Sequence, residues 1–253
     1  MCYNKRMKEI TTLTVMGYPL LRESLTKIEI GERKQVINTL NPHSYILAKS
    51  DQPFEKALRA SDLLLPDGSG MVLAAQQINQ ESLTKVAGSD LHHHLLQELD
   101  RSGGSCFYMG ARDHTLGRIE ARLKREYPNL RVGFYAPPYR DVFSTEESQE
   151  IISVVNAFKP DVLFVGLTAP KQEKWLHAHQ ELLEFKIGCC VGAVFDFYAG
   201  TIQRSSQFWI DHHLEWLPRL FREPKRMWRR NFISTPLFLL DMLRFKLGWK
   251  YRA

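Results

Sequence analysis

Two short polar segments, each directly after an apolar run, carry the side chains with the most evident chemistry. The first is Leu65-Pro66-Asp67-Gly68-Ser69-Gly70, and the second is Gly166-Leu167-Thr168-Ala169-Pro170-Lys171-Gln172-Glu173. Each pattern predicts a strand that ends in a loop before a helix, and ligands of open α/β sheets bind at such loops. One loop supplies a carboxylate, and the other supplies polar and charged groups beside a helix N-terminus, where anions bind well. The pair predicts an enzyme that acts on a phosphorylated substrate.

Asp67 is the candidate general base. An Asp-Gly pair at a strand end is often only a turn, but a carboxylate at this edge of a sheet could deprotonate a hydroxyl nucleophile. Thr39 and Asn41 end the preceding strand, where their side chains could hold sugar hydroxyls beside Asp67. Asn41 followed by Pro42 is also a typical helix start, and the two interpretations are compatible.

Patterns typical of metal and dinucleotide sites are missing from the sequence. His92, His93 and His94 are adjacent, and neighbouring helical residues point in different directions, so these three cannot converge on one ion. No Asp-x-Asp pair is present to hold a divalent cation against a diphosphate. The segment around Gly110 resembles a strand–loop–helix nucleotide site only in outline, because it lacks the GxGxxG spacing. We therefore expect neither a metal nor a cofactor.

Apolar and polar segments alternate in a way that predicts a Rossmann-like α/β fold, with a mostly parallel sheet covered by helices on both faces. Residues 1–34 are ambiguous, with short strands indicated around 16–19. The alternation stops near Gly200, and helical spacing of aromatic and basic residues follows. We expect a core over 1–202 and a helical basic appendage over 203–253. Strands are expected at 35–40, 62–65, 105–110, 130–135, 161–165 and 186–191, and helices at 45–60, 70–78, 89–101, 113–127, 144–158 and 172–183.

Charge is concentrated at the C-terminal end of the 253-residue chain. Residues 219–252 hold ten basic side chains against Glu223 and Asp241, whereas the whole chain has a net charge of only +6. Such a tail needs an anionic partner: nucleic acid, anionic lipid or a phosphorylated substrate. The interrupted apolar stretch from Phe232 to Lys250 favours an interfacial helix on a membrane. Four cysteines without CxxC spacing and no recognisable signal peptide favour a reducing, cytoplasmic compartment.

Seven ordered motifs, covering roughly residues 10–235, resemble the WecG/TagA/CpsF family of bacterial glycosyltransferases. Together, and at this consistent spacing, the motifs are a specific signal, whereas any one of them alone is not. They are Thr39-Leu40-Asn41-Pro42, Asp67-Gly68, Gly88-Ser89-Asp90-Leu91, Met109-Gly110, Val165-Gly166 through Pro170-Lys171-Gln172-Glu173, Val191-Gly192-Ala193-Val194-Phe195-Asp196-Phe197-Tyr198-Ala199-Gly200, and Leu214-Glu215-Trp216 through Arg219-Leu220, Glu223-Pro224 and Arg226.

The resemblance implies an inverting, metal-independent glycosyltransferase. Such enzymes move a sugar, commonly N-acetylmannosamine, from a UDP-sugar to a polyprenyl-diphosphate-linked sugar. Their products enter teichoic acid, common antigen or exopolysaccharide synthesis. The implied location is cytoplasmic and peripheral, on the inner face of the bacterial membrane and against its anionic surface, with no nucleic-acid partner. A homo-oligomer is compatible with the sequence.

The family's base aspartate falls on Asp67, and Arg219 and Arg226 correspond to arginines of the appendage that are thought to grip diphosphate. The other positions that match family motifs are expected to bind substrate: Thr39, Asn41, Gly68, Gly88, Asp90, Gly110, Lys171, Gln172 and Glu173.

Two alternatives to a glycosyltransferase remain open from the residues alone. One is a non-catalytic nucleotide-binding module, which would bind a sugar nucleotide without transfer. The other is a nucleic-acid-binding protein that uses the basic tail, whose binding would be strongly salt-sensitive and indifferent to Asp67→Asn.

Overall fold

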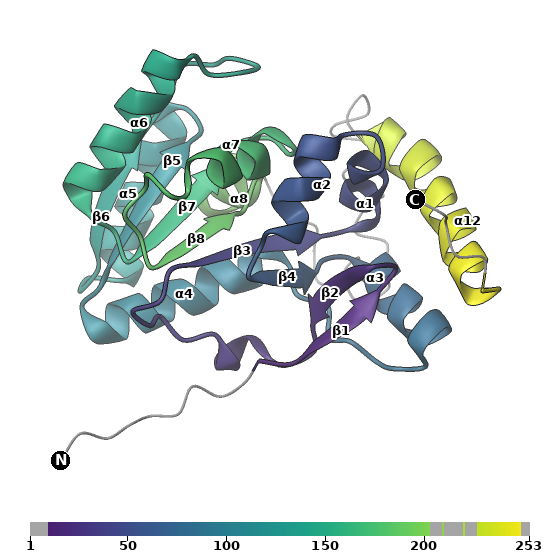
Figure 1. Ribbon diagram of the computed structural model, residues 1–253. Helices are drawn as coiled ribbons and strands as arrows, with labels where there is room; N and C mark the ends of the chain where they lie inside the picture. The colour runs from purple at the N-terminus through teal and green to yellow at the C-terminus, as the bar shows by residue number, and fades with distance from the viewer. Residues whose placement is uncertain (1–9, 203–208, 210–219, 221–226, 249–253) are drawn as a thin grey trace.

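The computed structural model describes residues 10–202, 209, 220 and 227–248. Its eight strands form one sheet in the order β1-β2-β4-β3-β8-β7-β5-β6 (Figure 1). β1 and β2 pair as an antiparallel hairpin, and every other neighbouring pair is parallel. The strands are β1 (Thr12–Val15), β2 (Tyr18–Leu21), β3 (Gln35–Leu40), β4 (Leu63–Pro66), β5 (Ser105–Gly110), β6 (Arg131–Tyr135), β7 (Val162–Gly166) and β8 (Ile187–Cys190).

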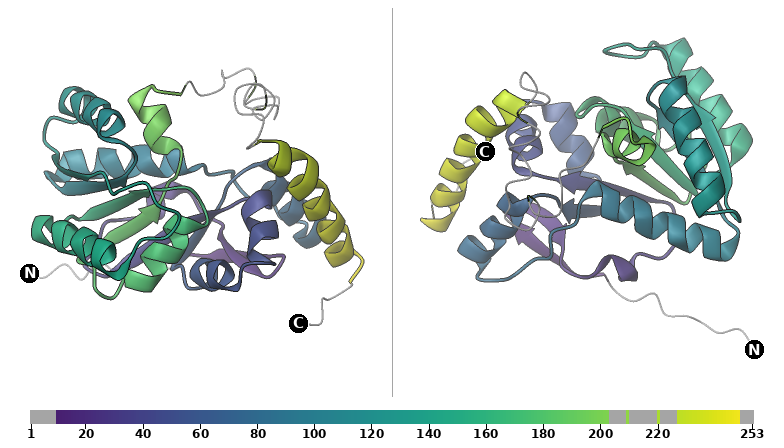
Figure 2. Two further views of the ribbon diagram at one scale, coloured as in Figure 1. Left: turned by 90° about the horizontal axis from the view of Figure 1, so that it is seen from above. Right: turned by 180° about the vertical axis from the view of Figure 1, so that it is seen from behind.

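Helices cover both faces of the sheet, as Figure 1 and the two further views of Figure 2 show. The helices that follow the strands are α1 (Pro42–Ala48), α2 (Gln52–Arg59), α3 (Ser69–Ala74), α4 (Gly88–Ser102), α5 (Asp113–Glu126), α6 (Thr145–Phe158), α7 (Lys171–His179) and α8 (Val194–Ala199). A 3-10 turn (Leu25–Lys27) precedes β3, and the π-helical turn η2 (Ala75–Asn79) continues α3.

Successive residues of the central strands point into different hydrophobic clusters, because side chains alternate along a strand. In β5, Cys106 and Tyr108 pack with α4, α5 and α8, whereas Phe107 and Met109 pack with α6 and α7. A third cluster joins the hairpin and β4 to α1, α2 and α3. Strands buried on both sides read as continuous apolar runs, which is why the sequence revealed them clearly.

The predicted α/β class is confirmed, and each of the six expected strands is present to within a residue or two. The single helix expected over 45–60 is wrong. Asp51 interrupts it, because its carboxylate accepts a hydrogen bond from the Phe54 backbone N–H (3.0 Å) and begins a second helix with Pro53 in its first turn. The helix expected to reach residue 183 ends at His179.

Two further elements form the described part of the C-terminal appendage: the π-helical η3 (Arg229–Ser234) and α12 (Thr235–Lys246). Both views of Figure 2 place α12 at the edge of the molecule beside α1. Its inner face buries Phe238 edge-on against Tyr45, and the buried Asp241 pairs with Lys49, which directly follows α1, and with Arg244. These contacts fix α12 to the sheet domain through one apolar and one ionic anchor.

The outer face of the appendage is apolar and exposed. Leu240, Leu243 and Leu247 form a stripe at helical spacing and are 45%, 50% and 67% exposed, far more than the fully buried Phe238. Trp228, Phe232 and Ile233 extend the apolar surface across η3. Within the described residues, no helix is both long and apolar enough to cross a bilayer.

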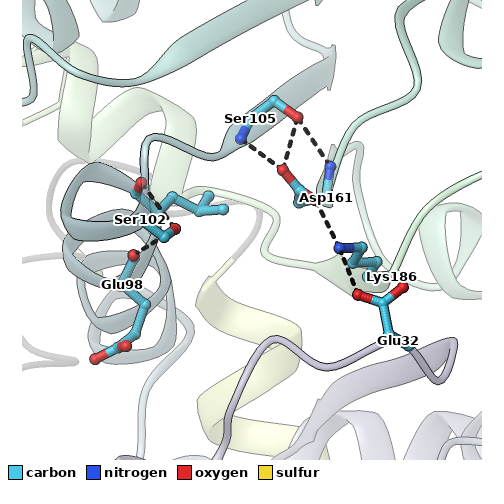
Figure 3. A network of polar contacts seen from close by, with 7 residues as sticks. Glu32, Glu98, Ser102, Ser105, Asp161 and Lys186 are labelled. Carbon is cyan, nitrogen blue, oxygen red and sulfur yellow. Dashed lines mark hydrogen bonds and ion pairs between the residues drawn. The ribbon is translucent and has the colours of Figure 1, made fainter.

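A polar network ties strands together at the amino edge of the sheet, opposite the loops singled out by the sequence (Figure 3). The Asp161 carboxylate, just before β7, accepts hydrogen bonds from the backbone N–H and hydroxyl of Ser105 (2.8 and 2.9 Å). Lys186, before β8, bridges Asp161 and Glu32. Burial alone would raise the pKa of Asp161, but these hydrogen bonds and Lys186 lower it. The network holds β5, β7 and β8 in register.

The three adjacent histidines of α4 have three different partners. His92 Nε2 is 2.6 Å from the Tyr108 hydroxyl, whereas His93 and His94 contact the Tyr127 hydroxyl and the Ile28 carbonyl. His92 is buried among aromatic rings. Burial, with smaller contributions from His93 and Arg122, lowers the pKa of His92 to about 3.

We expect His92 to make the fold acid-sensitive. In the unfolded chain its pKa is about 6.5, so as the pH falls from there towards 3 only the unfolded state gains the proton. The free energy of unfolding should then decrease by up to about 1.4 kcal/mol per pH unit from this group. Urea unfolding between pH 7 and pH 5 tests this. His92→Phe should reduce the slope of the unfolding free energy against pH by about one proton, whereas the exposed control His114→Gln should leave that slope unchanged. Equal slopes for the wild type and both variants would refute the role given to His92.

Candidate active site

A cavity of about 260 Å³ lies at the carboxyl edge of the sheet, where β3, β4, β7 and β8 end. It collects side chains from both polar segments of the sequence and from the appendage. Small-molecule sites commonly enclose about 300–1,000 Å³, so this cavity alone suits one small group such as a sugar ring. Its polar lining comes from Thr39, Asn41, His43, Ser44, Asp67, Ser89, Thr168, Gln172, Glu173 and Arg230.

Asp67 is held by the neighbouring strand. Its backbone N–H donates to the carbonyl of Leu40 at 2.9 Å, which continues the pairing of β4 with β3 by one residue. The Asn41 side-chain Nδ2 lies 3.4 Å from Asp67 Oδ2 and donates to it. After Asp67 the chain turns sharply at Gly68, whose φ of +84° favours glycine. The carboxylate is thereby fixed at the strand end, half-buried in the cavity wall.

Asn41 caps a helix, as expected, and also contacts Asp67; its binding to sugar hydroxyls stays a prediction. Its Oδ1 accepts a hydrogen bond from the Ser44 backbone N–H at 3.0 Å and so caps α1, while its Nδ2 reaches Asp67. Gly70 makes this arrangement possible, since a Cβ there would lie 2.4 Å from the Pro42 ring. A cap and a site residue are combined in one side chain.

Gln172 and Glu173, in the first turn of α7, are almost fully buried in the same cavity wall, at 4% and 5% exposure. Gln172 Nε2 donates to Glu173 Oε1 at 2.8 Å. Burial raises the pKa of Glu173 to about 7, although the hydrogen bond from Gln172 opposes that shift. Glu173 is therefore a carboxyl that carries a proton in a large fraction of molecules at neutral pH.

The remaining expected residues of the described chain divide into two groups. Thr39 and Gly88 line the cavity with Asp67. Gly68, Asp90, Gly110 and Lys171 do not: Gly68 makes the turn, Asp90 accepts a hydrogen bond from the Ala87 N–H (2.9 Å) at the start of α4, and Gly110 gives β5 a close approach to Gly166. The Lys171 ammonium lies 3.5 Å from the centre of the Phe143 ring and donates to the Arg140 carbonyl, and burial lowers its pKa.

A second, larger cavity of about 1,170 Å³ adjoins the first. The two share the loop Leu167–Ala169 after β7 and the turn Gly192–Ala193 after β8. The larger cavity continues past the start of α5 and is lined by Lys171, Arg112 and Arg140. Three carboxylates, Asp113, Asp141 and Asp196, line it as well, so the cavities offer a small compartment beside Asp67 and a larger one with charges of both signs.

Arg230 of η3 is a cavity residue that sequence reasoning did not single out. Its segment is held near α1 by a 2.8 Å contact between His43 Nδ1 and the Ser234 hydroxyl. A cluster of arginines was visible in the sequence, but only the packing of the appendage shows that this one reaches the cavity. Arg219 and Arg226, expected to bind diphosphate, lie outside the described residues.

Within the part of the chain that the structure describes, no group of three or more His, Cys, Asp or Glu side chains is arranged to hold a metal ion. The side chains that line the cavity include Asp67, the polar groups around it and Arg230.

A carboxylate at the carboxyl edge of a parallel sheet, beside two adjoining cavities, lies where open α/β folds bind their ligands. Comparison with known proteins identifies the class: the chain belongs to the glycosyl transferase WecG/TagA/CpsF family, whose model matches residues 10–252. The resemblance seen in the motifs is confirmed, and the protein is a glycosyltransferase.

Similar proteins include three that are named N-acetylglucosaminyldiphosphoundecaprenol N-acetyl-β-D-mannosaminyltransferase. The one from Bacillus spizizenii is 31% identical over 82% of this chain and 78% of its own length. The Bacillus subtilis protein is 29% identical over 92% and 91%, and the Staphylococcus aureus MW2 protein 26% identical over 83% and 80%.

Proposed function

We propose that this enzyme transfers N-acetylmannosamine or a related sugar from a UDP-sugar to a polyprenyl-diphosphate-linked N-acetylglucosamine, with inversion and without a metal ion. The names of the similar proteins support the substrate class. The observation that carries the proposal is the Asp67 carboxylate, which is oriented by Asn41 in a sugar-sized cavity that opens into a larger one.

The proposed reaction is a single displacement. Asp67 takes the proton of the acceptor hydroxyl as that oxygen bonds to the anomeric carbon of the donor sugar, and the bond from this carbon to the diphosphate oxygen breaks. The electron pair leaves with the nucleoside diphosphate. Attack from the face opposite the leaving group inverts the anomeric configuration. In this proposal Thr39, which lines the cavity, and Asn41, which contacts the Asp67 carboxylate, hold sugar hydroxyls during this step.

The negative charge that develops on the diphosphate needs cationic and N–H donors. Arg230 enters the small cavity, and Arg112, Arg140 and Lys171 line the larger one, where the nucleotide would lie. Arg219 and Arg226 of the appendage are proposed as further diphosphate ligands. Charge-assisted hydrogen bonds from such groups are about twice as strong as neutral ones.

We expect transfer to survive EDTA. The proposed mechanism places the base on Asp67 and the charge stabilisation on arginines, and the sequence has no Asp-x-Asp pair to bridge a cation and a diphosphate. The test measures transfer from a UDP-sugar to a short-chain lipid-diphosphate acceptor, with and without millimolar chelator. If the chelator abolishes transfer and added Mg²⁺ or Mn²⁺ restores it, the metal-free mechanism is overturned.

The appendage is proposed to place the enzyme on the cytoplasmic face of the membrane. The two helical elements that carry the outer apolar stripe also carry Arg229, Arg244 and Lys246, and basic residues combined with an apolar face are typical of helices that lie in an anionic interface. We accordingly propose a catalytic core over 1–202 and an appendage over 203–253 that both binds the membrane and completes the site.

Replacement of the outer stripe should separate membrane binding from folding. We expect the triple variant Leu240→Ser, Leu243→Ser, Leu247→Ser to bind anionic vesicles at least tenfold more weakly. Burial of each half-exposed leucine in the interface contributes roughly 1 kcal/mol of binding free energy. Co-sedimentation with anionic and neutral vesicles measures this. Leu182→Ser, which replaces a leucine of 63% exposure far from the appendage, is the control. Equal pelleting of all proteins would show that the stripe does not bind membrane.

A further inference from the structure

Helix α12 is apolar on two opposite faces. The inner face contributes Phe238, Met242 and Phe245 to the hydrophobic cluster that it shares with α1 and α3. The outer face carries four leucines that are 41–67% exposed: Leu239, Leu240, Leu243 and Leu247. Because the gain from burial follows the apolar area that is covered, packing through the leucine face would be comparably favourable. Hydrophobic burial therefore does not by itself determine how α12 is rotated against the sheet domain.

Asp241 is the acidic residue of the inner face, and its side chain is almost fully buried. Lys49 donates to its Oδ2, and Arg244 Nη1 donates to its Oδ1 at 3.1 Å. In a rotated α12, Lys49 would lie against leucine side chains without this carboxylate, and an unpaired charge against an apolar surface is costly. Buried ion pairs often add little net stability compared with apolar residues of similar size, but they can fix one packing among several. The pair thus favours the observed rotation.

The rotation of α12 is transmitted to the cavity through η3, which α12 continues without a break. The Thr235 backbone N–H and hydroxyl both donate to the Arg230 carbonyl, the hydroxyl at 3.0 Å. Arg230 lines the cavity that contains Asp67, whereas Asp241 lies outside its lining. Because the two segments share one helical backbone, the rotation that Asp241 selects also determines where Arg230 points.

We propose that Asp241 is a positioning residue for the transfer reaction. Its ion pair with Lys49 sets the rotation of α12, and that rotation directs Arg230 into the cavity and the leucine face away from the sheet domain. The link to transfer rests on the proposed function, in which Arg230 stabilises the leaving diphosphate. The rotation itself can be tested without any activity.

The activity test replaces the ion pair by apolar residues of similar size, Lys49→Met with Asp241→Leu. Thermal unfolding should occur at the wild-type temperature or above. The variant should nevertheless lose at least tenfold in kcat/KM for transfer to a short-chain lipid-diphosphate acceptor, because Arg230 is no longer held in the cavity. When added to Arg230→Ala, the same two changes should lower kcat/KM by less than a further threefold. The control Lys124→Met with Glu120→Leu, which removes an exposed ion pair of α5, should stay within twofold of the wild type.

The labelling test measures the rotation directly. A maleimide reacts with a cysteine introduced at one of two neighbouring positions, and mass spectrometry of the labelled peptide gives the rate. In the wild-type background, Leu243→Cys on the outer face should react at least tenfold faster than Met242→Cys on the inner face. In the apolar Lys49→Met, Asp241→Leu variant this ratio should fall to threefold or less. Lys49→Arg keeps the cation and should preserve both the labelling ratio and kcat/KM to within about threefold.

Several results would overturn the role given to Asp241. They are near-normal transfer by the folded apolar variant, a tenfold or greater further loss when its changes are added to Arg230→Ala, and an unchanged labelling ratio. Failure of the apolar variant to fold would also overturn it, since the ion pair would then be needed for stability rather than for rotation. If the wild type transfers no sugar, the proposed function is refuted, and the labelling ratios alone decide whether Asp241 sets the rotation.

Discussion

Replacement of Asp67 by asparagine should reduce kcat by about 10²–10⁴ while the fold is retained, because loss of a general base typically has this effect. Asparagine has the same shape and can still contact Asn41, but it cannot take the proton of an acceptor hydroxyl. The measurement is the steady-state rate of transfer to a short-chain lipid-diphosphate acceptor, at saturating concentrations of both substrates.

The matched control is Glu120→Gln. This change also removes one negative charge, but Glu120 is paired with Lys124 on the outer face of α5. Its rate should stay within a factor of two of the wild-type rate. If Asp67→Asn turns over as fast as this control, Asp67 is not the base, and the displacement mechanism must be assigned to another group.

Arg230→Ala should lower kcat/KM by about 10²-fold, the typical effect of removing one charged donor to a developing anion. The reason is geometric: Arg230 lines the cavity that contains Asp67, although it belongs to the appendage. The Arg230→Ala variant should bind anionic vesicles almost as well as the wild type, because attraction to the membrane is a sum over many basic and apolar groups.

Lys246→Ala provides the comparison for Arg230. It removes the same charge from the adjoining helix, where the ammonium is bound to Gln77 at 2.7 Å, away from the cavity. Transfer by Lys246→Ala should be close to normal. Similar losses in both variants would mean that the appendage acts through its overall charge, and the local role given to Arg230 would be wrong.

The sequence was most informative where one physical effect dominates. Buried parallel strands such as β5 and β7 are continuous apolar runs. The polar loops that follow the carboxyl ends of parallel strands lie at one edge of the sheet. That reasoning placed Thr39, Asn41, Asp67, Gln172 and Glu173 together, and the structure brings all five into one cavity. The role of each in binding or catalysis stays a prediction.

Sequence reasoning failed where two weak local signals compete or where distant packing decides. The helical run after Asn41 masked the break at Asp51, although the Asp51–Pro53 pair is a typical helix start. Arg230 could not be distinguished from its basic neighbours, because its place depends on how Phe238 and Asp241 fix the next helix to α1. The hydrogen bond between Gln172 and Glu173 depends on side-chain geometry, which periodicity does not reveal.

The most direct test of the central claim is the product of the purified protein itself. The protein is incubated with UDP-N-acetylmannosamine and a short-chain lipid-diphosphate N-acetylglucosamine, and the lipid product is examined by mass spectrometry and proton NMR. The account predicts an acceptor heavier by one N-acetylhexosamine residue, joined with the anomeric configuration opposite to that in the donor. A product that retains the donor configuration, or consumption of the donor without any new glycosidic bond to the acceptor, would contradict it.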